Sequence, residues 1–247
     1  MSNGNFLTVE IGAHLGSLHL DISFALTARW TCLFGASGSG KTSILRAITG
    51  SLLPDRGRIA LGESEVLPGG QLLFDQATHL SLPPHRRAVR SAAQQAWLFP
   101  GTVSDNVGYG TSLRTRRDAV EEVLARFRLA ALADTRVESL SGGERQRVSL
   151  ARGVAAALHG DHRIGLLLLD EPFAGMDAPL RDQLAPELRD WLRERKMPVL
   201  SVTHDVGEPF LLRAEVVRVA AGKVTAQGPA SEVLSEEKQR LRAMLDS

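Results

Sequence analysis

An eight-residue stretch, Gly35–Thr42, most constrains what this chain can fold into. It reads G-A-S-G-S-G-K-T and fits the P-loop pattern G-x-x-x-x-G-K-S/T. The apolar run Trp30–Phe34 before it predicts a buried strand, and Ser43–Thr49 after it predicts a short helix that ends at Gly50. Glycines let the backbone turn tightly and point N–H groups at phosphate oxygens, and a helix N-terminus adds partial positive charge. The stretch therefore predicts a phosphate-binding loop between a strand and a helix.

Individual side chains of the loop have expected roles. Lys41 is expected to reach the β- and γ-phosphates of a nucleotide, and the Thr42 hydroxyl is expected to ligate Mg²⁺. The alternative, a glycine-rich turn that happens to precede a lysine, is disfavoured by the flanking strand and helix. The predicted nucleotide-binding residues in this region are Gly35, Ala36, Ser37, Gly38, Ser39, Gly40, Lys41, Thr42 and Ser43.

Composition narrows the classes of protein that remain. The 29 Lys and Arg balance the 28 Asp and Glu, which indicates no general nucleic-acid or membrane-surface binding. Cys32 is the only cysteine, so no intrachain disulfide can form. No secretory signal is visible, and no apolar run approaches the ~20 residues of a membrane span. We therefore expect a cytosolic protein that reaches a membrane only through a partner.

Apolar periodicity places the loop in a sheet. The alternating segments Leu7–Ile11 and Leu18–Leu26 predict antiparallel strands ahead of the loop. Continuous apolar runs at Ile164–Leu169 and Pro198–Thr203 predict strands buried on both faces of a parallel sheet. The other expected strands are Arg58–Leu61, Glu215–Val219 and Val224–Gln227. Helices are expected at Arg116–Leu129, Ser141–Leu158 and Ser231–Leu245. A further helix is expected where Leu180, Leu184, Leu188 and Trp191 form an apolar stripe at helical spacing.

Alternation of strands and helices around a P-loop predicts an α/β fold. We expect one domain over residues 1–247, with a P-loop NTPase core at about 1–95 and 160–247. The core is expected to carry an antiparallel β subdomain, and an α-helical subdomain is expected to be inserted at about 96–159. Residues 62–84 are rich in Gly, Pro and polar residues and predict a loop or hairpin. The basic cluster His85–Arg90 follows; a solvated loop is the favoured interpretation, and a position beside a phosphate is the alternative.

A second glycine motif occurs at residues 141–144, which read S-G-G-E. Ser141 with Glu144 three residues later makes a good capping box for an ordinary helix. Two consecutive glycines at the start of a helix cost stability, and they leave bare N–H groups at its positive end. Gly142 and Gly143 thus predict a second phosphate site. Two such helix starts in one chain suggest a nucleotide held between two chains.

Polar residues end two of the predicted buried strands. Asp170 can hold Mg²⁺ through water, and Glu171 can orient or deprotonate an attacking water. His204 ends the next strand and can contact a γ-phosphate from there, although a lone histidine is more often structural.

The order of these motifs resembles that of the ATP-binding subunits of ABC transporters over nearly the full chain. The shared order is P-loop, glutamine loop with Gln94, signature Leu140–Glu144, Asp170-Glu171-Pro172, aspartate loop with Asp177, and switch histidine His204. The resemblance implies a single ABC ATPase domain and a head-to-tail dimer, in which each ATP lies between one chain's P-loop and the other's signature. It also implies that Gln94 senses Mg²⁺ and contacts a membrane subunit.

Together these inferences assign catalytic roles to Glu171, His204 and Gln94, and metal contacts to Thr42, Gln94 and Asp170. The nucleotide contacts expected outside the P-loop are Ser141, Gly142, Gly143, Glu144 and Asp177.

Within the family, the likeness is to import-type subunits, and especially to those of molybdate importers. Those subunits usually carry a C-terminal regulatory domain, for which these 247 residues leave no room. The resemblance implies ATP and Mg²⁺ as cofactors, with ATP hydrolysis driving uptake of a small nutrient such as molybdate. Expected partners are a second copy of the chain, permease subunits and, indirectly, a solute-binding protein, with no nucleic acid.

The expected location is the cytoplasm, at the inner face of the cell membrane through the permease. The alternatives are a non-transport ABC ATPase acting on DNA or ribosomes, disfavoured because no long coiled-coil insertion is present, and a P-loop kinase or GTPase, disfavoured because the guanine motif N-K-x-D is absent.

Overall fold

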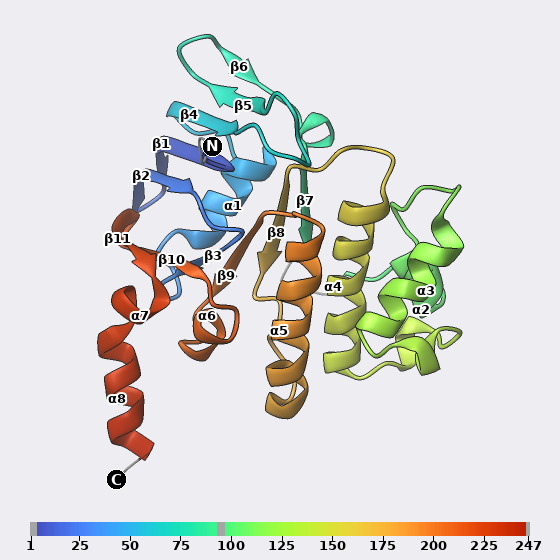
Figure 1. The fold of residues 1–247 in the computed structure, drawn as a ribbon. Coiled ribbons are helices and arrows are strands. Elements are labelled where there is room, and N and C mark those ends of the chain that lie inside the picture. Colours follow the sequence, from blue (N-terminus) through green and yellow to red (C-terminus); the bar gives the residue numbers. More distant parts are fainter. Residues whose placement is uncertain (1–3, 93–96, 246–247) are drawn as a thin grey trace.

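The structure is a computed structural model that describes residues 4–92 and 97–245. These residues are organised around an eleven-stranded mixed sheet (Figure 1). Its strands are β1 (Leu7–Leu15), β2 (Leu18–Leu26), β3 (Trp30–Phe34), β4 (Arg56–Leu61), β5 (Gln71–Asp75), β6 (Leu80–Ser81), β7 (Val89–Ala92), β8 (Leu166–Asp170), β9 (Val199–Thr203), β10 (Glu215–Ala220) and β11 (Lys223–Pro229). They lie side by side in the order β6-β5-β4-β1-β2-β11-β10-β3-β9-β8-β7.

The centre of the sheet is parallel and buried on both faces. Strands β10, β3, β9, β8 and β7 pair in parallel in that order, whereas β1, β2, β4, β5 and β6 pair antiparallel beside them. Cys32 and Leu167 pack into one apolar cluster, and their neighbours Leu33 and Leu168 pack into another on the opposite face. The continuous apolar runs were thus correctly interpreted as buried parallel strands.

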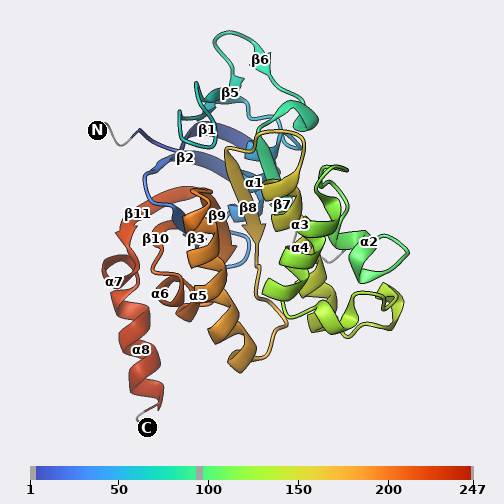
Figure 2. The same ribbon diagram turned by 45° about the vertical axis from the view of Figure 1, so that its right-hand side comes forward.

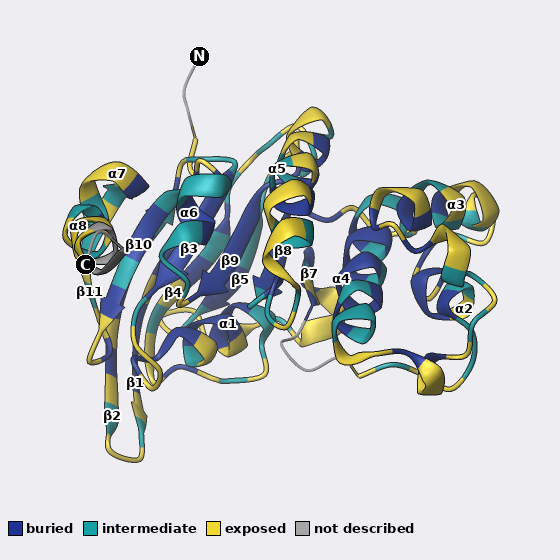
Figure 3. Ribbon diagram, turned by 90° about the horizontal axis from the view of Figure 1, so that it is seen from below, coloured by how far each residue is buried: buried dark blue, intermediate teal, exposed yellow. Residues whose placement is uncertain are grey.

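Helices cover both faces of this sheet, and the view from below shows buried strands between α1 and α5 (Figure 3). Apolar residues of α1 join the cluster on one face, and those of α4 and α5 join the cluster on the other. The helices are α1 (Lys41–Thr49), α2 (Val103–Val107), α3 (Arg116–Arg126), α4 (Gly142–His159), α5 (Ala178–Glu194), α6 (Gly207–Leu211), α7 (Ala230–Val233) and α8 (Ser235–Leu245), with single 3₁₀ turns at Pro84–Arg86, Ala130–Leu132 and Val137–Ser139.

The described chain between β7 and β8 is helical. Figure 2 shows α2 and α3 to the right of the sheet, and Figure 3 shows that α4 lies between the sheet and these two helices. Val107 of α2, Val123 of α3 and Val154 of α4 belong to the same apolar cluster as Leu167 of β8. The helices are therefore anchored to the sheet through α4. The division into a core and a helical subdomain stays a prediction.

The predicted continuous helix Ser231–Leu245 is wrong, because the chain forms α7 and α8 with a break at Leu234. Leu234 is fully buried in the cluster beneath β10. Arg218 of β10 donates to the Val233 carbonyl at 2.6 Å and to the Glu237 carboxylate at 2.6 Å, so its guanidinium lies between the two helices. These contacts join residues far apart in sequence, which is why the local pattern did not predict the break.

The interpretation of His85–Arg90 as a solvated loop is also wrong, at Arg87. This side chain is 3% exposed, and its guanidinium donates to the carbonyls of Ala47 and Ile48 at 2.7 and 2.8 Å. Both carbonyls belong to the last turn of α1, which a cation stabilises. A third bond, to the Leu82 carbonyl, is 2.8 Å long. Arg87 therefore fixes the C-terminal end of the P-loop helix, and the chain continues from it into β7.

We predict that Arg87→Ala lowers the free energy of unfolding by about 2–3 kcal/mol, because three carbonyls lose a charged donor. Arg87→Lys should recover part of the loss, since an ammonium cannot reproduce the planar fork. Urea unfolding measures the effect, with the exposed neighbour Arg86 as the control: Arg86→Ala should change stability by no more than about 0.5 kcal/mol. Equal losses in Arg87→Ala and Arg86→Ala would contradict the capping role.

Candidate functional site

The P-loop follows the fully buried strand β3, and its glycines are required by the backbone path. Gly38 and Gly40 have φ of 79° and 109°, in the region that favours glycine. A Cβ atom on Gly35 would lie 2.1 Å from the Val219 carbonyl oxygen, and one on Gly40 would lie 2.6 Å from a Leu20 methyl. Helix α1 begins at Lys41, earlier than the predicted Ser43, and it ends at Gly50 as expected.

Lys41 is folded back over the loop that precedes it. Its Nζ donates to the carbonyls of Gly35 and Ala36 at 2.7 and 2.9 Å, and the residue is 7% exposed. Burial lowers the pKa of Lys41, whereas the charges of Glu171 and Asp170 raise it. The loop therefore holds a cation at its centre, opposite two carboxylates.

One pocket of about 250 Å³ joins the P-loop to the end of β8. It lies at the carboxyl edge of the central strands, where ligands bind in open α/β sheets. Its lining residues are Leu18, Ser37, Gly38, Gly40, Lys41, Thr42, Ser43, Asp170, Glu171 and Val202. The structure thus brings together the predicted phosphate loop and the predicted acidic pair.

Asp170 and Glu171 have different environments. Burial and then the charge of Glu171 raise the pKa of Asp170, and the charges of Lys41 and Arg46 lower it. Glu171 has φ of 48°, a left-handed conformation that costs free energy in a residue with a side chain. Its amide donates to the Val202 carbonyl at 3.0 Å. The chain leaves β8 in this conformation, and the Glu171 carboxylate contacts His204, which follows β9.

His204 lies beside Glu171, as expected for residues that end neighbouring parallel strands. Its Nδ1 is 2.9 Å from Glu171 Oε1, and its side chain is 64% exposed. The pairing of Asp170 with Val202 places these two strand ends next to each other. The exposed imidazole and the largely buried carboxylate therefore form a pair at the rim of the pocket.

The S-G-G-E motif begins α4 and does not line this pocket. Ser141 is the N-cap, and its amide and hydroxyl donate to Glu144 Oε2 at 2.8 and 2.7 Å, so the capping box is present. A Cβ atom on Gly143 would lie 3.0 Å from the Gly175 carbonyl oxygen, whereas one on Gly142 would meet nothing within 4 Å. Packing within the chain accounts for Gly143 but leaves the exposed Gly142 without a structural requirement.

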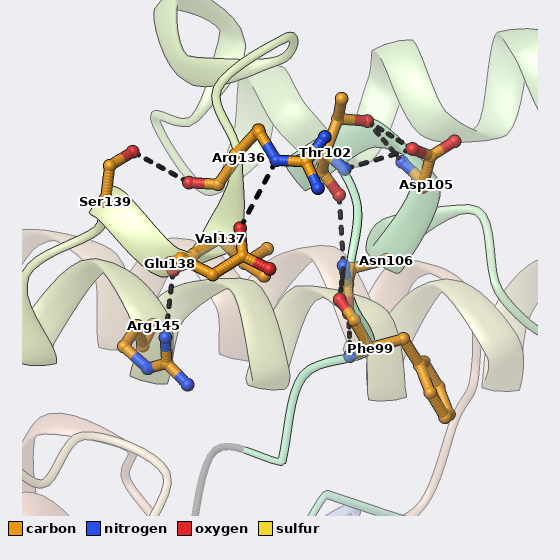
Figure 4. Close-up of polar contacts among 9 residues, drawn as sticks. All are labelled: Phe99, Thr102, Asp105, Asn106, Arg136, Val137, Glu138, Ser139 and Arg145. Atoms are coloured by element: carbon orange, nitrogen blue, oxygen red, sulfur yellow. Dashed lines mark hydrogen bonds and ion pairs between the residues drawn. The ribbon is translucent and has the colours of Figure 1, made fainter.

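The start of α4 is tied to the segment that follows the glutamine loop (Figure 4). Asn106, 1% exposed, accepts from the Phe99 amide at 2.8 Å and donates to the carbonyls of Phe99 and Thr102 at 2.9 and 3.0 Å. Val137, just before the motif, donates to the Gly101 carbonyl at 3.0 Å and accepts from Arg145 at 2.9 Å. Gln94 itself lies outside the described residues.

Asp177 is placed as a helix cap. Its carboxylate accepts from the Leu180 amide at 2.9 Å at the N-terminus of α5, and Asp177 does not line the P-loop pocket. Its expected nucleotide contact therefore stays a prediction.

Two buried polar residues of the site region were not predicted from the sequence. Gln146, on α4, donates from Nε2 to the Glu171 carbonyl at 3.4 Å. Glu208, on α6, is 5% exposed, and its Oε2 has no hydrogen-bond partner within the described part of the chain. Neither is marked by a local pattern. Only the position of Gln146 one turn into the signature helix could have drawn attention to it.

Comparisons with known proteins show which family has a sequence and a fold like those of this chain. A profile of the ABC transporter family matches residues 20–174, more than half of the chain. Three proteins named "Molybdenum import ATP-binding protein ModC" are similar to this chain. That of Mesorhizobium japonicum is 35% identical, and the alignment covers 97% of this chain and 64% of the relative. Those of Brucella suis and Rhodospirillum rubrum are 36% and 35% identical, with alignments that cover 92% and 93% of this chain and 60% of each relative. The chain therefore spans about three fifths of the length of these relatives.

Two solved structures share the fold. The cbiO1 chain of Clostridium perfringens, described as part of the ABC transporter complex cbiONQ, has a TM-score of 0.77 at 23% identity, covering 98% of this chain and 95% of that chain. A bacterial Atm1-family ABC exporter with ATP bound has a TM-score of 0.72 at 21% identity, covering 96% of this chain and 41% of that chain. These likenesses confirm the predicted α/β P-loop NTPase fold.

Glu208 should make stability depend on pH. Its pKa is raised from 4.5 to about 7: burial raises it most, the charges of Asp205 and Glu171 also raise it, and Thr203 and Arg181 lower it. Between these pKa values the folded state binds more protons than the unfolded state, so the free energy of unfolding falls as pH rises through this window.

We predict that Glu208→Gln removes this loss, because its side chain stays neutral. The difference in free energy of unfolding between the variant and the unsubstituted chain should grow in favour of the variant as the pH rises from 4.5 to 7.5. This growth should be at most about 3 kcal/mol. Urea unfolding across this range measures the difference, with the exposed Glu121→Gln as the control. Parallel pH profiles for Glu208→Gln and the unsubstituted chain would show that Glu208 ionises normally.

Proposed function

The chain belongs to the ABC transporter family, and from this premise we propose that it is an importer's nucleotide-binding subunit that hydrolyses ATP to drive solute uptake. The observation that carries the proposal is the pocket shared by the P-loop, Asp170 and Glu171. A phosphate cradle and a water-activating carboxylate in one pocket are the groups that phosphoryl transfer to water requires.

The P-loop would bind the phosphates of ATP. Backbone amides at Gly38, Gly40 and the start of α1 would donate hydrogen bonds to the phosphate oxygens, and the helix end would favour their negative charge. Lys41 would exchange its bonds to the Gly35 and Ala36 carbonyls for bonds to the β- and γ-phosphates. Its buried position means that its charge is little screened by water before ATP binds.

The residues at this pocket fit Mg²⁺. Thr42 and Asp170 offer a hydroxyl and a carboxylate, and oxygen donors are those that Mg²⁺ prefers. Among the described residues, no group of three or more His, Cys, Asp or Glu side chains could hold a metal ion, so phosphate oxygens would complete its shell. Bound Mg²⁺ would neutralise charge that develops on the phosphates. Gln94, the third predicted ligand, lies outside the described residues.

Glu171 and His204 would act on the attacking water and the γ-phosphate. The 2.9 Å contact between their side chains holds the carboxylate and imidazole in one orientation. Glu171 would orient the water and accept its proton, and His204 would contact the γ-phosphate from the rim. The bonds from Gln146 and to Val202 fix the Glu171 backbone, so the carboxylate is positioned before ATP arrives.

A second copy of the chain would complete the site. Ser141 and Gly142 lie exposed at a helix start, outside the P-loop pocket of their own chain, and no packing within the chain requires glycine at residue 142. The bare amides at this positive helix end would receive the γ-phosphate of ATP bound to the partner chain. Gly143, Glu144 and Asp177 would support this contact, and the two chains would lie head to tail.

Permease subunits are the proposed route to the membrane. Among the described residues, no helix is both long and apolar enough to cross a bilayer. Trp97, Phe99 and Tyr109 are 74%, 46% and 58% exposed, and the Phe99 and Tyr109 rings contact each other with centroids 4.4 Å apart and planes tilted by 42°. Exposed aromatic groups of this kind mark protein interfaces. Trp97 and Phe99 follow Gln94 by three and five residues in the sequence, so a permease docked on this patch would contact the segment that follows the glutamine loop.

The proposed solute is an oxyanion such as molybdate, which the names of the relatives support. A solute-binding protein would deliver it to the permease and would not contact this chain. The chain would work in the cytoplasm, at the inner face of the cell membrane.

Two variants should separate ATP binding from hydrolysis. Lys41→Ala should lower both ATP affinity and turnover by about tenfold to a hundredfold or more, because the charge at the β- and γ-phosphates is lost. His204→Ala should keep ATP affinity and lower turnover by about a hundredfold, because the imidazole acts only on the γ-phosphate.

Calorimetric titration with ATP and a phosphate-release assay measure these two quantities. The control is His79→Ala, which removes an exposed imidazole on the β5–β6 hairpin and should change neither. Near-normal turnover in Lys41→Ala would refute the proposed function, and near-normal turnover in His204→Ala would return His204 to a structural role.

A further inference from the structure

A basic pocket of about 480 Å³ lies at the opposite end of β7 and β8 from the nucleotide site. Its lining includes Arg86, Arg87, Arg90 and Arg163, together with His85 and His162. They precede or begin β7 and β8, whose first residues pair as Val89 with Leu166, whereas Asp170 ends β8 at the other edge. The turn at Pro84–Arg86 and the loop that leads into β8 lie side by side in both views (Figures 1 and 2).

The backbone that carries the arginines of this pocket is held rigidly at residues 86–88. The Gln71 side chain donates to the Arg86 carbonyl at 2.9 Å and accepts from the Ala88 amide at 2.6 Å, so it clamps the chain on both sides of Arg87. Arg87 is itself anchored by the end of α1. A binding site whose frame is fixed in advance loses little conformational entropy when a ligand arrives.

Among the described residues, no acidic side chain balances the charges of this pocket. No acidic residue lines it, and Asp161, next to His162 in sequence, is not among the lining residues. In the residues that the structure describes, Arg86, Arg90 and Arg163 make no ion pair. In contrast, Arg29 and Arg56 elsewhere on the surface are paired with carboxylates at 2.6 and 2.9 Å. Several unpaired like charges around one hollow repel each other, and a bound anion would relieve that repulsion.

We propose that this basic pocket binds a phosphate group. Guanidinium groups from two separate segments face one hollow, and planar forks of this kind match the oxygens of phosphate. The volume falls within the range of about 300–1,000 Å³ that is typical of small-molecule sites. The phosphate belongs either to a soluble metabolite or to the headgroup of an anionic lipid. The inference does not depend on the proposed transport function, because the pocket shares no residue with the P-loop pocket.

The soluble source is tested with pyrophosphate as the probe. The ¹⁵N-labelled chain is first saturated with ADP, so that the P-loop is filled. Amide signals of residues 85–90 and 162–164 should then shift saturably during the titration, while those of residues 36–43 stay in place. The double variant Arg90→Ala/Arg163→Ala should weaken binding by about tenfold or more, because two charge-assisted contacts are lost. The matched control Arg117→Ala removes an exposed, unpaired arginine of α3 and should leave the affinity unchanged.

The lipid source is tested by sedimentation with phosphatidylglycerol vesicles, compared with neutral phosphatidylcholine vesicles. Binding to the anionic vesicles that the double variant loses and Arg117→Ala keeps would support the proposal and identify a headgroup. Pyrophosphate binding with the same dependence would support it and identify a soluble ligand. The ADP affinity of each variant shows that it is folded. If the double variant changes neither binding, or if Arg117→Ala weakens binding equally, the pocket is an ordinary solvated surface and the proposal fails.

Discussion

Parallel pairing of β3, β9 and β8 is the constraint on which the arrangement of the site depends. Because the three strands run in the same direction, their carboxyl ends meet at one edge of the sheet, with Phe34 beside Thr203 and Asp170 beside Val202. The chain leaves these ends as the P-loop, the Glu171 turn and His204. Main-chain hydrogen bonds and apolar packing on both faces of the sheet fix the positions of these groups.

The rigidity of that edge explains how an unfavourable backbone conformation can persist at Glu171. Its positive φ costs about 1–3 kcal/mol, a cost that the surrounding structure must offset. Val202 on β9 and Gln146 on α4 hold its amide and carbonyl from two sides. Helix α4 thus holds the backbone of Glu171 in its own chain through Gln146, while its exposed start at Ser141 is proposed to receive the nucleotide of a partner chain. One helix therefore serves two nucleotide sites in the proposed dimer.

The P-loop helix is fixed at both ends by different means. At its start the left-handed glycines Gly38 and Gly40 set the loop, and at its end Arg87 donates to the last carbonyls. Arg87 reaches α1 from the segment that enters β7, and β7 pairs with β8, which carries Asp170. The basic segment that holds α1 also presents its remaining arginines to the opposite end of the sheet. The positive charges of these remaining arginines therefore form no ion pair within the described chain.

How far the sequence predicts the molecule depends on whether a feature is local. The P-loop, the acidic end of β8 and the capped start of α4 are encoded in a few consecutive residues, and their backbone geometry follows from glycine, strand and capping chemistry. Strand β7 is four residues of mixed polarity and has no periodic signal. The burial of Arg87, the bond from Gln146 and the break at Leu234 each depend on a partner distant in sequence, so no local pattern could indicate them.

In the proposed dimer, ATP is held between the P-loop of one chain and the signature of another. The most direct test is the mass of the particle in solution, measured by light scattering after size-exclusion chromatography. Glu171→Gln removes the base and a negative charge beside the γ-phosphate, so this variant should be a monomer without ATP and a dimer with it.

Glu171→Gln/Ser141→Arg should still bind ATP at Lys41 but remain a monomer, because a bulky side chain fills the place of the partner's phosphate. Glu171→Gln/Ser81→Arg, which alters an exposed serine on the β5–β6 hairpin, should dimerise normally. ATP-driven dimerisation of the Ser141→Arg variant would contradict the claim and leave the signature motif as a capped helix only.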